Sequence, residues 1–269
     1  MGDTPLSLEP QELIELLASG RSPTVIDVRR QEAYEASDIT VATAIWRDPL
    51  SVHEWSNDLD GDRGVVAYCI HGHQMSQGVA ALLRSAGLTA RYLVGGIDGF
   101  VEGGGPTVTR KSLPQRGPDG RTRWVTRARP KIDRIACPWL VRRFLDPDAA
   151  ILYVEAEHVD AVAEGTGATP FDVDGVELTR MNGNCSFDAF LKKFDVQDEA
   201  VDALADIVRG ADTRHYKLAP ESAGLVSISR GLAVLHIDDL AMLDAGMKMY
   251  DALYADCRQR MSENAGEGS

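Results

Sequence analysis

The chain has 269 residues, of which 44% are hydrophobic, and its formal net charge at pH 7 is −13. This hydrophobic content is typical of a folded protein, and the negative charge disfavours nucleic-acid binding, which needs a basic surface. No apolar run is long enough to cross a bilayer, and the N-terminus lacks the basic and apolar segments of a signal peptide. We therefore expect a cytoplasmic protein that does not contact membranes.

The first hundred residues alternate between helix-like and strand-like segments. A helix is expected from Ser7, as the N-cap, to Gly20. Further helical patterns fall at 31–39 and 76–88, and strand-like runs fall at 24–28, 41–46, 64–70 and 90–96. Strands that alternate with helices indicate an α/β domain, with a parallel sheet covered by helices on both faces.

A stretch rich in Gly, Pro, Arg and Ser follows and suggests a linker. We expect domains at 1–104 and 123–269, joined by a linker at 105–122. In the second domain, strand-like runs fall at 123–130 and 149–157, and helical patterns at 135–146, 187–194, 198–212, 221–235 and 238–260. The second domain is therefore expected to be α+β and mainly helical.

Cys69 ends a buried strand-like run and is followed by a short loop and a helix. Backbone N–H groups of such a loop point at one place, and the helix dipole adds positive potential there. A thiolate or persulfide on Cys69 would be stabilised, and its pKa would be lowered. Gly72 allows the loop to turn sharply. The competing interpretation is that Cys69 is a small core residue.

Three motifs resemble the rhodanese family of sulfurtransferases: VIDVRRQEAYEASDI, YCIHGHQMS and GLTARYLVGGIDGF. The resemblance implies that Cys69 is the catalytic residue, that it forms a persulfide, and that no cofactor is required. It further implies the substrate-binding residues Arg29, Ile70, His71, Gly72, His73, Gln74 and Met75. The partners would be a small-molecule sulfur donor or oxyanion and a thiol acceptor.

One departure affects the choice of donor. Many rhodaneses carry an arginine five residues after the catalytic cysteine, and this chain has Gln74 there. The loop's basic groups are His71 and His73, and an imidazole, unlike a guanidinium, loses its charge near neutral pH. Thiosulfate and a persulfide both remain open as donors.

The second domain resembles the C-terminal region of the ChrB chromate-resistance family. The matching strings include RWVTRARPKIDRIACPWLVRRFLDPDAAILYVEAEHV, NCSFDAFLKKF and IVRGADT. The resemblance implies an association with chromate or another oxyanion stress. Members of that family carry a different N-terminal region linked to DNA binding, so a role on DNA is not carried over.

Two further sites are candidates in this domain. Arg129, Lys131, Arg134 and Arg142 could bind a tetrahedral dianion through several cationic groups, or form only a solvated basic patch. His158, Cys185 and Asp212 could form a mixed site for zinc or iron, although no local ligand motif joins them. Cys137 and Cys185 are candidate thiol acceptors, and Cys257 is expected to be structural.

The leading hypothesis is a sulfurtransferase coupled to a domain that handles an oxyanion or a metal. Two alternatives remain at this point. The protein could be a non-catalytic sensor of an oxyanion or a metal, or a metal-dependent enzyme centred on the second domain. The sequence does not predict the oligomeric state.

Overall fold

The computed structural model describes residues 5–20, 22–180 and 183–267, and it divides the chain into two compact units. The first unit contains residues 1–111 with 143–145, and the second contains 112–142 with 146–269. Within the described residues, no helix combines the length and apolarity needed to cross a membrane. The first four residues of the segment that argues against a signal peptide lie outside the described residues.

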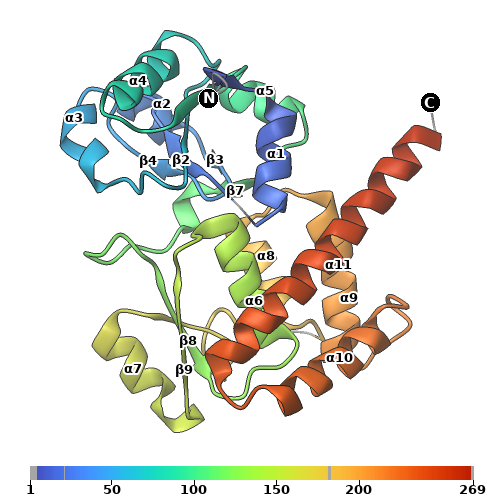
Figure 1. Cartoon of the computed structure of the whole chain (residues 1–269). Helices are drawn as coiled ribbons and strands as arrows, with labels where there is room; N and C mark the ends of the chain where they lie inside the picture. The colour runs from blue at the N-terminus through green and yellow to red at the C-terminus, as the bar shows by residue number, and fades with distance from the viewer. Residues whose placement is uncertain (1–4, 21, 181–182, 268–269) are drawn as a thin grey trace. The chain divides into compact units, whose positions relative to one another are not determined.

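The first unit is built on five short parallel strands (Figure 1). These strands are β1 (Ser7–Leu8), β2 (Thr24–Asp27), β4 (Ile45–Trp46), β5 (Val65–Tyr68) and β6 (Ala90–Leu93), in the order β1-β6-β5-β2-β4. A separate antiparallel pair joins β3 (Ile39–Val41) to β7 (Thr107–Thr109). The helices are α1 (Pro10–Ala18), α2 (Gln31–Ala36), α3 (Val52–Trp55), α4 (Gln74–Ser85) and α5 (Gly96–Glu102), with 3-10 turns η1 (Ser56–Asp58) and η2 (Arg110–Ser112).

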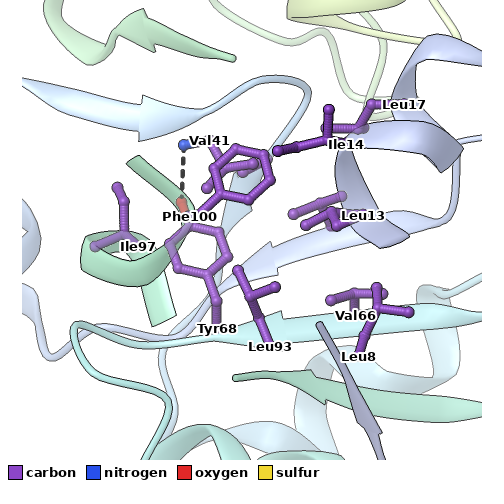
Figure 2. Close-up of a cluster of buried hydrophobic side chains, with 12 residues drawn as sticks. Leu8, Leu13, Ile14, Leu17, Val41, Val66, Tyr68, Leu93, Ile97 and Phe100 are labelled. Carbon is purple, nitrogen blue, oxygen red and sulfur yellow. Dashed lines mark hydrogen bonds between the residues drawn. The ribbon is translucent and has the colours of Figure 1, made fainter. Parts of the chain in front are cut away.

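Helices cover both faces of this sheet, as the alternating pattern predicted. On one face, Leu13 and Leu17 of α1 and Phe100 of α5 pack against Val66 and Tyr68 of β5 (Figure 2). On the other face, side chains of α3 and α4 pack against the alternate residues of β2 and β5. Successive strand residues point to opposite faces, so Cys69, which follows Tyr68, lies on the α4 face.

The first helix differs from the expectation. Ser7 is not its N-cap, because Ser7 and Leu8 pair with β6 as strand β1. The helix begins at Pro10, whose fixed φ suits a first helical position. Glu9 and Glu12 form the capping box, in which the Glu9 N–H donates to Glu12 Oε2 at 3.1 Å.

Strand β7 lies inside the predicted linker at 105–122 and pairs with β3 in the first unit. The domain boundaries of 1–104 and 123–269 remain a prediction.

The second unit contains a small parallel sheet and several longer helices (Figure 1). Its strands are β8 (Arg123–Arg127), β9 (Ala150–Val154) and β10 (Thr169–Pro170), in the order β10-β8-β9. Its helices are α6 (Asp133–Leu140), α7 (Val159–Thr166), α8 (Ser186–Phe194), α9 (Glu199–Asp212), α10 (Ser222–Leu235) and α11 (Asp239–Glu267). Helix α6 continues into a π-helical turn, η3 (Val141–Leu145), and a 3-10 turn, η4 (Ala156–His158), precedes α7.

Strand β8 is the centre of the second unit's core. Trp124 packs against Phe190 of α8, with ring centroids 5.4 Å apart, while Val125 points the other way and packs against Val159 of α7. The sheet therefore has helices on both faces, and the helical remainder fits the expected α+β class.

Candidate active site

Cys69 lies directly beyond the carboxyl end of the central strand β5. Four consecutive buried residues, VVAY, fix this strand between β2 and β6. Ligands of open parallel sheets bind outside the carboxyl ends of the strands. The cysteine is thus held at the edge of the sheet where a substrate can approach, and its side chain is 9% exposed.

Two glycines let the loop after Cys69 fold tightly. Gly72 has φ +70° and Gly96 has φ +60°, conformations that residues with a Cβ rarely adopt. A Cβ on Gly72 would collide with the Leu93 carbonyl oxygen, and a Cβ on Gly96 with the Cys69 carbonyl oxygen. The Ile97 N–H donates to that same carbonyl at 3.0 Å, which ties the loop to the start of α5.

The Cys69 sulfur is surrounded by hydrogen-bond donors. The Ser76 hydroxyl lies 3.3 Å from Sγ, and backbone N–H groups of Ser76, His73 and Gly72 also contact the sulfur. Burial raises the pKa of the Cys69 thiol, but these hydrogen bonds together lower it below the value of an ordinary cysteine. The result is a thiol that ionises readily and a thiolate that is already solvated by the protein.

An open cavity of about 700 Å³ lies beside this sulfur. Its lining comprises Val28, Arg29, Arg30, Ala33, Cys69, Ile70, His71, His73, Gln74, Met75 and Gln77. All the predicted substrate-binding residues line it except Gly72, which is a buried residue of the loop.

Within this lining, Arg29 is bound by the protein itself. Its guanidinium makes a two-nitrogen contact with the buried Asp27 carboxylate, with Nη2 to Oδ2 at 2.6 Å, and donates to the Ile39 carbonyl at 3.0 Å. The Tyr68 hydroxyl donates to the same carboxylate at 2.9 Å. Arg29 therefore holds β2 and β3 together, and Asp27 neutralises most of its charge.

The polar loop residues are exposed. His71 Nδ1 lies 3.0 Å from Asp98 Oδ2, and the His71 and His73 rings are 5.8 Å apart. Gln74 is the first residue of α4 rather than part of the loop, so it lies at the rim of the cavity and carries no charge.

Sequence reasoning missed Arg30, Ser76 and Gln77 at this site. Arg30 is exposed and lines the cavity, and Gln77 Nε2 donates to the Gly72 carbonyl at 3.0 Å. The signal for Ser76 was its helical position. The first N–H groups of a helix have no partners within the helix and point back toward the preceding loop. A hydroxyl in this first turn lies beside these N–H groups and can contact the same anion.

A second cluster of charged groups lies in the second unit, around the buried carboxylate of Asp172. Arg127 Nη2 lies 3.1 Å from its Oδ2, Arg134 Nε lies 3.3 Å from the same oxygen, and the Ser186 hydroxyl donates to Oδ1 at 2.8 Å. Arg180 Nη2 lies 3.6 Å from Oδ1. Three guanidiniums thus compensate one buried acid.

Asp133 and Asp212 adjoin this cluster. Burial, followed by the charges of Asp172 and Asp212, raises the pKa of Asp133 to about 7. Burial also raises the pKa of Asp212, although Arg180 and a hydrogen bond with the Asp133 carboxyl oppose the shift. Burial therefore favours the protonated form of both carboxyl groups.

Comparison with known proteins identifies the first unit. Residues 9–102 match the family model of the rhodanese-like domain. Thiosulfate sulfurtransferase GlpE of Pseudomonas entomophila (strain L48) is 34% identical to the chain over 89 residues, which are 33% of this chain and 77% of GlpE. The chain belongs to the rhodanese-like family. A rhodanese-related protein of Thermoplasma volcanium, of known structure, is 26% identical and covers 39% of this chain and 98% of its own, with a TM-score of 0.34.

Residues 124–257 match the family model of the ChrB C-terminal domain. Protein ChrB of Cupriavidus metallidurans (strain ATCC 43123 / DSM 2839 / NBRC 102507 / CH34) is 32% identical over 162 residues, which are 59% of this chain. The chain covers 48% of the length of that relative. The predicted pairing of a rhodanese-like domain with a ChrB-like domain is confirmed.

Three of the four predicted anion-binding residues of the ChrB C-terminal domain contact different aspartates. The Arg129 backbone N–H donates to Asp239 at 3.1 Å, Arg134 pairs with Asp172, and Arg142 Nη1 lies 3.8 Å from Asp244 Oδ1. Lys131 is exposed. The guanidiniums that lie close together belong to Arg127, Arg134 and Arg180, and they surround the Asp172 carboxylate. An anion site at the four predicted residues remains a prediction.

The candidate zinc or iron site is likewise not assembled. Cys185 and Asp212 both lie near Asp133, whereas His158 is an exposed residue at the start of α7. Burial raises the pKa of the Cys185 thiol, which disfavours the thiolate form that binds metals. In the described part of the chain, no group of three or more His, Cys, Asp or Glu side chains is arranged to hold a metal ion.

The candidate acceptor thiols are poorly placed for exchange. Cys137 is fully buried, and burial raises its pKa, as it does for Cys185. Cys257 is also buried, and its pKa is raised for the same reason. Cys69 differs from these three thiols, because it is the one whose pKa is lowered.

Proposed function

We propose that the rhodanese-like domain is a sulfurtransferase that carries sulfur as a persulfide on Cys69. The observation that supports this most is the contrast among the four free cysteines. Cys69 has a lowered pKa and borders a cavity, while burial raises the pKa of the others. The relative GlpE is named a thiosulfate sulfurtransferase, which is consistent with the proposal.

The mechanism needs one nucleophile and a set of N–H donors that stabilises its negative charge. The Cys69 thiolate attacks the sulfane sulfur of the donor, a new S–S bond forms on Sγ, and the donor's own sulfur bond breaks with its electron pair on the leaving group. A second thiolate then takes the outer sulfur and regenerates the Cys69 thiolate. The N–H groups of Gly72, His73 and Ser76 contact Sγ and stabilise the negative charge of the thiolate.

We propose that Ile70, His71, His73, Gln74 and Met75 form the wall against which the donor binds, with Gly72 shaping the loop. Arg29 acts as a positioning residue, because Asp27 already binds its guanidinium. The free cysteines are consistent with a reducing compartment such as the cytoplasm. The ChrB C-terminal domain would connect sulfur transfer with chromate or another oxyanion stress.

A second candidate function is oxyanion binding without turnover. It rests on Gln74, which stands uncharged at the cavity rim where many rhodaneses have an arginine. This would make the rhodanese-like domain a sensor, and its Cys69 would not need to accept sulfur.

Steady-state sulfur transfer to a thiol acceptor separates the two functions. The full chain should release transferred sulfur from thiosulfate or glutathione persulfide over many turnovers, and Cys69→Ala should abolish this. Cys257→Ala is the matched control and should keep the activity. Tight oxyanion binding without any turnover would favour the sensor.

A further inference from the structure

The cavity beside Cys69 is larger than an inorganic donor needs. Its volume of about 700 Å³ falls within the range of roughly 300–1,000 Å³ found for pockets that hold organic ligands. Much of the wall is apolar, since Val28, Ala33, Ile70 and Met75 line it. A small dianion such as thiosulfate would leave most of this space filled with water.

Arg30 supplies positive charge on the cavity wall. Arg30 comes shortly after the end of β2, and Cys69 comes directly after the end of β5. These strands pair in parallel, with Asp27 opposite Tyr68. Both residues therefore lie at the same edge of the sheet and line one cavity. Arg30 is exposed, and within the described residues its guanidinium has no carboxylate partner.

The neighbouring charges limit what Arg30 can bind. Asp27 already neutralises Arg29. A second cavity of about 440 Å³ shares Arg29, Ala33 and Ile70 with the first, and its lining includes Asp98 and Glu102. One available guanidinium near two carboxylates suits a single anionic group better than a compact dianion.

We propose that Arg30 binds the carboxylate of an organic persulfide of peptide size, and that such a compound is a better sulfur donor than thiosulfate. This inference rests on the proposed sulfurtransferase function. It accounts for a chain that keeps the cysteine loop of a rhodanese but has the uncharged Gln74 after it, while Arg30 lines the same cavity.

The transfer step balances without any added oxidant or reductant. The Cys69 thiolate attacks the outer sulfur of the donor R–S–S–H, and the bond between the donor's two sulfurs breaks. The products are Cys69–S–S–H and the thiolate R–S⁻, with the proton remaining on the transferred sulfur. Arg30 does not touch the reacting atoms, so it is expected to affect binding of the donor rather than the chemical step.

The test compares three donors on the full chain: glutathione persulfide, the uncharged persulfide of 2-mercaptoethanol, and thiosulfate. We expect kcat/KM for glutathione persulfide to exceed that for thiosulfate by about tenfold or more. Arg30→Gln should raise KM for glutathione persulfide about three- to fivefold, the effect of losing one exposed charge pair, with kcat unchanged. KM for the uncharged persulfide should not change.

Arg63→Gln is the matched control, because Arg63 is exposed in the same unit and does not line the cavity. Thiosulfate reacting as well as glutathione persulfide, or Arg30→Gln weakening all donors equally, would overturn the inference and leave the sulfurtransferase intact. If the wild type accepts sulfur from none of the three donors, the proposed function fails as well.

Discussion

The hydroxyl of Ser76 should be a main cause of the low pKa of Cys69. Ser76 is fully buried in the first turn of α4, with Oγ 3.3 Å from the Cys69 sulfur and 3.2 Å from the His73 carbonyl oxygen. In Ser76→Ala, that carbonyl keeps the hydrogen bond from the Gln77 N–H at 3.1 Å. The substitution therefore removes a donor from the sulfur without leaving a buried acceptor unpaired.

The size of the pKa change depends on the two hydrogen bonds open to the Ser76 hydroxyl, to the Cys69 sulfur and to the His73 carbonyl oxygen. A hydrogen bond to a charged group contributes roughly 1.5–3 kcal/mol, and turning the hydroxyl away from the His73 carbonyl costs part of it. A net loss of about 1.4 kcal/mol corresponds to one pKa unit. We thus expect Ser76→Ala to raise the pKa of Cys69 by about one unit.

The assay is the pH dependence of alkylation by iodoacetamide, with the modified cysteine identified by peptide mass. The midpoint for Cys69 should move to higher pH in Ser76→Ala, and sulfur transfer near neutral pH should slow with it. Ser85→Ala, on the exposed part of the same helix, is the matched control. An unchanged midpoint in Ser76→Ala would refute the role of this hydroxyl.

Two further predictions concern stability. Because the pKa of Asp133 is raised to about 7 in the fold, Asp133 stabilises the protein in acid, and this contribution, at most about 4 kcal/mol, is lost as pH rises from about 4 to 7. Asp133→Asn, which stays uncharged, should match the wild type most nearly in urea unfolding near pH 4 and exceed it near pH 8; equal pH dependence would contradict this. In the other domain, Gly72→Ala should cost more than about 1 kcal/mol and abolish sulfur transfer, because Gly72 has positive φ and abuts the Leu93 carbonyl. Gly78→Ala, with open space around it inside α4, should be neutral or stabilising by thermal melting, and equal losses in the two variants would contradict the account of the loop.

Local patterns predicted much of the rhodanese-like domain. The apolar run before Cys69 and the glycines after it act over a few residues, so strand, loop and helix could be predicted from neighbours alone. The two-residue strand β1 could not, because it exists through its pairing with β6, far away in the sequence. Ser7 has the residue type of an N-cap, but this pairing places it in the sheet.

For the charged residues too, the local sequence does not show which groups they contact. Arg29 and Arg30 are adjacent and look alike in the sequence, and both line the cavity, yet Asp27 binds the first, which is buried, and the second is exposed. In the ChrB C-terminal domain, Asp133, Asp172 and Asp212 come from three distant segments. Spacing along the chain cannot bring them together. In the basic run near Arg129, the Arg129 N–H, the Arg134 guanidinium and the Arg142 guanidinium contact three different aspartates, and an anion site at these residues stays a prediction.

Intact mass of the full chain after exposure to a sulfur donor tests the central claim most directly. The wild type, treated with glutathione persulfide or thiosulfate and freed of excess donor, should gain the mass of one sulfur atom, which a thiol acceptor then removes. Cys69→Ala should gain none. The same gain in Cys69→Ala, or no gain in the wild type with either donor, would contradict the assignment of Cys69 as the sulfur carrier.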